Sequence, residues 1–354
     1  MKNAFKTAFC ILGAIIGAGF ATGKEISTFF TRFGTKSLFG IAFSSVMFGI
    51  YVFFVLQRIR ADNILSPYKY IEKISNPFFA KISVILTYLF LLVSFSVMIT
   101  GASLLIREYV DVSNFFASFF VCFVCFCVLA NGKNGVVNAS AILTPVMILG
   151  IILVAVLSAK EKAAFMSFDN TMASSVIYVS YNTLPLLTLL CALSDSFKNG
   201  KDIKIMSIIL TFFIFILMFC LWYVLLANGL SYSNYDMPIV KISKKYGAYF
   251  EMFYCVVLFF AMLTTAFSSG IGIIDVMNKK IKSTNNIVNT LILCIFSLVM
   301  SYVGFSRFVN LVYPLFGYLG LSVFALIILD ILRKTKKNFK KKRKMDLFLQ
   351  NDKK

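Results

Sequence analysis

The sequence contains no histidine and only 15 acidic residues among 354. Without histidine, imidazole metal sites, histidine proton relays and histidine-based catalytic dyads are excluded. The chain also has no phosphate-binding loop of the form GxxxxGK[ST], which argues against ATP as an energy source. No nucleophile–base pair or metal cluster can be assembled from the remaining residues. These absences disfavour an enzyme, and we expect no cofactor other than a possible Na⁺ as a coupling ion.

The residues that are abundant are apolar. The chain is 59% hydrophobic, contains 40 phenylalanines and is only 14% charged. This composition excludes an ordinary soluble domain and places the chain among integral membrane proteins. Even the eight cysteines fall inside apolar segments, where they are expected to act as small buried side chains.

Apolar segments long enough for a hydrocarbon core of ~30 Å recur along the chain. They predict ten transmembrane helices at about 5–33, 37–57, 79–106, 113–130, 136–158, 172–195, 203–228, 247–276, 286–305 and 309–332. The spans predict a single transmembrane domain, 1–332, followed by a basic cytoplasmic tail, 333–354. Within the domain, a first set of five spans would cover about 5–158 and a second set about 172–332.

The distribution of basic residues predicts the orientation. If the amino terminus is cytoplasmic, the inner connections and tail hold 25 lysines and arginines, and the outer connections hold 10. Because cytoplasmic loops carry the excess of positive charge, both termini are expected inside. The net charge of +20 lies beside apolar spans and in the tail, so it indicates contact with an anionic lipid bilayer rather than nucleic acid. The oligomeric state cannot be read from the sequence.

The first span contains the stretch GAIIGAGFATGKEI, with four glycines at 13, 17, 19 and 23. Glycine weakens a helix by ~1 kcal/mol relative to alanine, so the stretch predicts unwinding around Gly17–Gly23 and two half-helices, about 5–16 and 24–33. The alternative is a packing face, because Gly13-x-x-x-Gly17 and Gly19-x-x-x-Gly23 both have the spacing that lets helices approach closely.

The sixth span carries a second candidate interruption, Tyr181–Pro185. Pro185 has no N–H and disfavours helix at the residue before it, although a kinked continuous helix is the alternative. Interruptions at corresponding places in two sets of five spans predict inverted repeats with a central binding site. The expected solute-binding residues are Gly17, Ala18, Gly19, Phe20, Ala21, Thr22, Gly23, Tyr181, Asn182 and Thr183.

The eighth span adds hydroxyl groups to an apolar helix. Side-chain hydroxyls and backbone carbonyls suit a hard cation, although serine and threonine can also bond back to their own helix. Glu25 follows the glycines and could couple transport to protons, or could form a structural cap with Lys24. The expected ion-binding or coupling residues are Glu25, Thr264, Thr265, Ser268 and Ser269.

The glycine stretch, the ten spans and the YVSYN sequence of the sixth span together resemble the YkvI-like bacterial membrane proteins. That group is similar to a distant branch of the amino acid–polyamine–organocation (APC) superfamily. The resemblance implies an all-α, LeuT-like fold of five plus five inverted helices, with broken helices 1 and 6, in the bacterial cell membrane. It also implies a solute held between those two helices.

We therefore expect a secondary transporter of a small solute, an amino acid or a related carboxylate, coupled to Na⁺ or H⁺. The alternative is a ligand-sensing membrane subunit that resembles the spore germinant receptors and carries out no net transport. The substrate itself is not implied by the resemblance.

Overall fold

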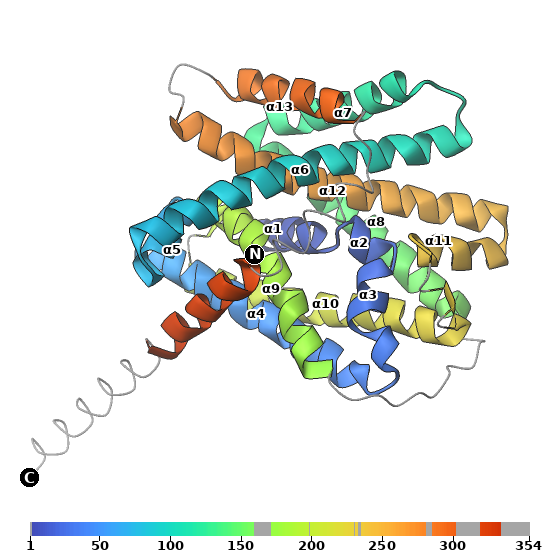
Figure 1. The fold of residues 1–354 in the computed structure, drawn as a ribbon, viewed down its shortest axis with the longest axis horizontal. Helices are drawn as coiled ribbons and strands as arrows, with labels where there is room; N and C mark the ends of the chain where they lie inside the picture. The colour runs from blue at the N-terminus through green and yellow to red at the C-terminus, as the bar shows by residue number, and fades with distance from the viewer. Residues whose placement is uncertain are drawn as a thin grey trace, which may run out of the picture.

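Figure 1 shows a computed structural model of the chain. It describes residues 2–158, 171–197, 199–229, 231–232, 235–280, 285–301 and 319–333. The tail 334–354 and parts of the ninth and tenth expected spans lie outside these ranges. The regular structure of the described residues is helical. The fold class is therefore all-α, as the sequence predicts.

The helices follow one another with short connections. The membrane-length and intermediate helices are α1 (Lys2–Ile15), α4 (Ser37–Ala61), α6 (Pro77–Tyr109), α7 (Asn114–Ala130), α8 (Gly132–Ser158), α9 (Thr171–Ala192), α10 (Gly200–Asn228), α12 (Ala248–Lys280) and α13 (Asn286–Met300). The short helices are α2 (Ala18–Ala21), α3 (Lys24–Phe29), α5 (Pro67–Ile74) and α11 (Pro238–Ser243), with 3₁₀ turns η1 (Thr31–Phe33), η2 (Ser194–Ser196) and η4 (Lys244–Tyr246). A further helix covers residues 319–333.

Six of these helices are long and apolar enough to cross a membrane, namely α4, α6, α8, α9, α10 and α12. Three shorter apolar helices, Phe5–Ile15, Asn114–Ala130 and Asn286–Met300, fall where the sequence predicts the first, fourth and ninth spans. The described residues therefore support a multi-pass membrane protein. The count of ten spans stays a prediction.

Helix α1 lies in the middle of the bundle. It packs against α8, α10 and α12, while α4 packs against α9 and α10. Figure 1 shows α7 and α13 side by side at one edge, where they cover α6 and α12. This arrangement surrounds the glycine-rich stretch with other helices, so its freed backbone groups are shielded from lipid.

The first apolar segment is divided into three helices. α1 ends at Ile15, α2 covers only Ala18–Ala21, and α3 starts at Lys24. Gly23 connects α2 to α3 with φ of +80°, a left-handed conformation that side chains other than glycine rarely adopt. The unwinding predicted for Gly17–Gly23 therefore coincides with a real division of the helix.

The interruption expected at Tyr181–Pro185 is not present. α9 runs as one helix from Thr171 to Ala192, with Pro185 inside it. The polar cluster stabilises the helix because its side chains bond to backbone carbonyls one turn earlier: Ser180 Oγ to Val176 O, Asn182 Nδ2 to Tyr178 O and Thr183 Oγ1 to Val179 O. Proline is tolerated in such a helix when neighbouring groups compensate, and the Tyr51 hydroxyl donates to Thr183 O at 2.8 Å.

Close packing between α8 and α12 gives a test of this arrangement. A methyl group added to Gly150 would overlap the Val257 side chain. We expect Gly150→Ala to cost ~1–3 kcal/mol by overpacking and to lower the apparent unfolding temperature in detergent. The same change in a Val257→Ala background should cost little, because the overlap is removed. An increase in stability from Gly150→Ala alone, as an unobstructed helical glycine would give, would contradict this packing.

Candidate functional site

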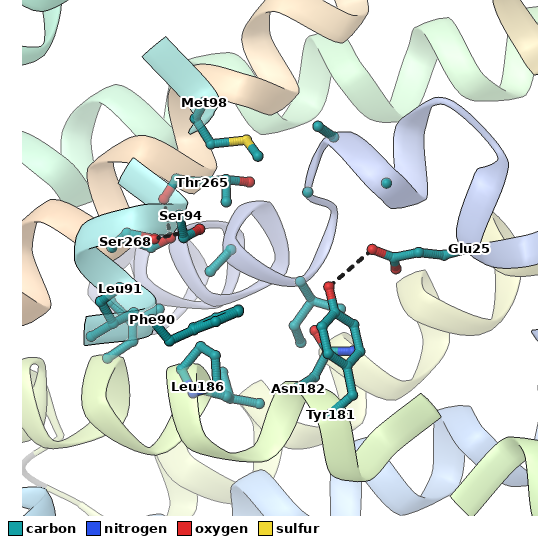
Figure 2. A pocket seen from close by; sticks show the side chains of 18 residues that line it. Glu25, Phe90, Leu91, Ser94, Met98, Tyr181, Asn182, Leu186, Thr265 and Ser268 are labelled. Carbon is teal, nitrogen blue, oxygen red and sulfur yellow. Dashed lines mark hydrogen bonds between the residues drawn. The ribbon is translucent and has the colours of Figure 1, made fainter. Parts of the chain in front are cut away.

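A pocket lies where the first helix is interrupted. Its walls come from the end of α1, from α2, from the start of α3, and from α6, α9 and α12. Figure 2 shows Glu25 facing Tyr181 on one side of the pocket, and Thr265, Ser268 and Ser94 on another. The pocket therefore gathers segments that lie more than 200 residues apart in the sequence.

The backbone at the interruption is held by partners from distant helices. The buried Tyr254 hydroxyl of α12 donates to Ala21 O at 2.6 Å, and the Ile239 N–H of α11 donates to Thr22 O at 3.0 Å. The Thr22 hydroxyl donates to Gly19 O at 3.1 Å. Unpaired carbonyls cost several kcal/mol in apolar surroundings, so these bonds allow irregular backbone to persist here.

Half of the expected solute-binding residues line the pocket. They are Gly17, Ala18, Gly19, Tyr181 and Asn182. The other expected residues, Phe20, Ala21, Thr22, Gly23 and Thr183, lie outside its wall. Ala21 and Thr22 accept the bonds that fix the interruption, Gly23 makes the left-handed turn, and Phe20 is fully buried. These residues therefore shape the site instead of facing its interior.

Glu25 reaches into the pocket from the first turn of α3. The Tyr181 hydroxyl donates to Glu25 Oε1 at 3.1 Å. The carboxylate occupies the space above Gly19, where a methyl group would overlap it. Gly19 therefore acts through its missing side chain, and the glycine and the carboxylate form one unit of the wall.

The hydroxyls of α12 face the end of α1. Thr264 donates to Gly13 O at 3.1 Å, and Thr265 Oγ1 lies 3.2 Å from where a methyl group on Gly17 would stand. Thr265 and Ser268 also bond back to their own helix, at Ala261 O and Thr265 O, as the alternative interpretation of these residues supposed. The Ser269 hydroxyl donates to the Ser94 hydroxyl of α6 at 3.3 Å. Thr265, Ser268 and Ser269 line the pocket, and Thr264 lies behind them.

Helix α6 contributes a wall that the sequence did not reveal. Phe90, Leu91, Ser94 and Met98 all line the pocket. Ser94 is buried in an otherwise apolar run, FLLVSFSVMIT, and that isolated serine was the available signal. The three apolar residues give no sequence signal that separates them from ordinary core positions.

The pocket is small. Its volume is ≈ 50 Å³, against roughly 300–1,000 Å³ for typical small-molecule sites. A solute as large as an amino acid therefore requires the surrounding helices to move apart.

The bond between Tyr254 and Ala21 can be tested directly. Tyr254→Phe leaves the Ala21 carbonyl buried without its donor, which costs roughly 1–3 kcal/mol. We expect a lower apparent unfolding temperature for the purified protein. Tyr249→Phe is a matched control on the same helix, because Tyr249 is 93% exposed. Equal effects of the two substitutions would show that the Tyr254 bond does not stabilise the interruption.

Comparisons with known proteins point to a membrane transport fold. No family model matches the chain. It is 25% identical over 338 residues to the uncharacterized protein YyaD of Bacillus subtilis, covering 93% of this chain and 97% of YyaD. It is 27% identical over 343 residues to the uncharacterized membrane protein YkvI of the same organism, covering 90% and 94%.

Two solved structures share its architecture. One is a Na⁺-coupled sialic acid symporter in a substrate-bound outward-open state, with a TM-score of 0.71, 12% identity, and coverage of 92% of this chain and 78% of the symporter. The other is MhsT in complex with L-phenylalanine, with a TM-score of 0.66, 15% identity, and coverage of 93% and 89%. The chain is thus similar to YkvI and YyaD in sequence and has the fold of these LeuT-like transporters.

Proposed function

We propose that the protein is a secondary active transporter of a small solute, an amino acid or a chemically related compound. One observation carries this proposal. A pocket with polar groups lies at the interruption of the first helix, within a fold shared with a Na⁺-coupled symporter and with a protein that binds L-phenylalanine. Interrupted helices at the centre of such bundles are where transporters hold their solutes.

The fold suggests how the helices work together. We infer ten membrane spans in two inverted sets of five, with both termini on the cytoplasmic side of the bacterial cell membrane. One group of helices would rock against the other, so that the pocket opens to each side in turn. The small pocket volume supports this view, because the described state is too contracted to admit a solute freely.

The end of α1 and the hydroxyls of α12 form a candidate cation site, with Na⁺ as its proposed occupant. The carbonyl end of a helix carries partial negative charge, and the Thr264 hydroxyl meets it at Gly13 O. Thr265 lies beside Gly17, one turn further along. Helix carbonyl ends and hydroxyl oxygens are the ligands that such transporters use for Na⁺. A proton is the alternative coupling ion.

Transport itself is tested in proteoliposomes. Uptake of radiolabelled amino acids should exceed that of protein-free vesicles when a Na⁺ gradient or a proton gradient is imposed, and should collapse with the gradient. Binding without flux under either gradient would contradict transport and would favour a ligand-sensing subunit.

The cation site has a test that needs no solute. Na⁺ that binds only the folded protein should raise its apparent unfolding temperature relative to K⁺ at equal ionic strength. Thr264→Val removes the hydroxyl at nearly constant volume and should abolish the Na⁺-dependent shift. Thr290→Val in α13 is the control, since Thr290 is also buried and bonds only within its helix. A shift retained in Thr264→Val would place the cation elsewhere.

The role of Gly19 is tested by Gly19→Leu. The larger side chain would displace the Glu25 carboxylate and fill the pocket. We expect the protein to insert and remain folded, with solute binding and uptake lost. Gly247→Leu is unsuitable as a control because of its positive φ, so Ala14→Leu, at the same pocket, serves to show whether bulk alone has the effect. Unchanged affinity in Gly19→Leu would mean that this glycine serves packing alone.

A further inference from the structure

The charge of the pocket is carried by one residue. Among the described residues that line it, Glu25 alone is ionisable as a carboxylate, and none is lysine or arginine. The remaining polar lining consists of hydroxyls and the Asn182 amide. The pocket therefore presents a single negative charge to whatever occupies it.

No cation of the described chain neutralises Glu25. No ion pair joins it to the lysines or arginines of the described ranges, and its one hydrogen bond there comes from the neutral Tyr181 hydroxyl. The neighbouring Lys24 turns away, and its Nζ donates to Tyr235 O at 3.1 Å. The structural pairing of Lys24 with Glu25 that the sequence left open is therefore not formed. A partly buried carboxylate without a positive partner is costly, which indicates that its partner is a ligand.

Two further groups next to Glu25 have unused hydrogen-bonding capacity. The Tyr178 hydroxyl lies beside the carboxylate, is fully buried and makes no hydrogen bond of normal geometry within the described residues. Asn182 spends its Nδ2 on Tyr178 O, so its carbonyl oxygen remains to accept from a ligand. A carboxylate can accept about four hydrogen bonds, and Tyr181 supplies one. An ammonium group, with its positive charge and three donors, fits these acceptors.

Glu25 stands apart from the hydroxyls of α12. Figure 2 shows it on the side of α3 and α9, whereas Thr265 and Ser268 lie on the opposite side with α6. A cation held between α1 and α12 therefore leaves Glu25 unneutralised. The two sides can bind two different positive charges at once.

Resting on the proposed transport function, we propose that Glu25 binds the ammonium group of the solute, so that the protein takes small amine-bearing solutes and rejects carboxylates that lack an amine. The Tyr181 hydroxyl orients the carboxylate, and Phe90 and Leu186 face the rest of the solute with apolar surface. A carboxylate on the solute would have no basic side chain to meet among the described lining residues. The amine is thus the group that recognition requires.

The test uses purified full-length protein and matched compounds that share a carbon skeleton. L-alanine, ethylamine and lactate form one set; L-leucine, isopentylamine and the hydroxy acid of leucine form another. Apparent unfolding temperature is measured over a concentration series of each compound, which gives an affinity without requiring transport. We expect the amino acid or the amine to stabilise the protein in at least one set, and the hydroxy acid to have no effect.

Substitutions assign the effect to Glu25. Glu25→Gln removes the charge and should weaken binding of the amine-bearing compounds roughly 10- to 100-fold. Glu108→Gln, which changes an exposed carboxylate at the end of α6, should leave their affinity unchanged. Glu25→Asp keeps the charge and should retain measurable binding, which controls for a fold defect in Glu25→Gln.

Three results would overturn the proposal: equal stabilisation by a hydroxy acid and its amino acid, an unchanged affinity in Glu25→Gln, or no response to any amine-bearing compound in either set. The preference for amines is measured on the unaltered protein, so it stands even if a variant does not fold. Binding of amines without flux would reject the transport function while supporting the role of Glu25. Flux of a solute without an amine would do the reverse.

Discussion

Backbone groups freed between α1 and α3 need hydrogen-bond partners, because the interior of a membrane protein offers no water to replace them. Tyr254 and Ile239 supply those partners at Ala21 and Thr22, and Thr264 meets the end of α1 at Gly13. Each donor comes from a segment more than 200 residues away. The interruption therefore exists only in the folded bundle, and the same contacts that hold it open also place α12 beside the pocket.

The pocket is chemically two-sided as a result. Hydroxyl and carbonyl oxygens gather where α1 meets α12, and a lone carboxylate stands opposite them on α3. Such a division suits two positively charged ligands of different size, an ion and an ammonium group. It also gives a physical reason for coupling, because filling both positions would join helices that otherwise meet across an underpacked space.

The glycine stretch was informative from sequence because each glycine relaxes a backbone constraint that no other residue can relax as well. The prediction at Tyr181–Pro185 was wrong, since polar side chains in a helix can bond either to a ligand or to their own backbone, and the pattern of residue types is the same for both. The apolar wall from α6 was missed for a related reason. Phe90 and Met98 differ from core residues only in what lies opposite them, which is a property of tertiary packing.

The most direct test of the account is the accessibility of the pocket from each side of the membrane. A cysteine placed at Ser268, in a chain without other cysteines, can be labelled with a membrane-impermeant maleimide in right-side-out and in inside-out vesicles. A transporter predicts labelling from both faces, with Na⁺ and an amine-bearing solute changing the ratio between them. Labelling from one face alone under every ionic and solute condition would contradict alternating access and the function proposed for this protein.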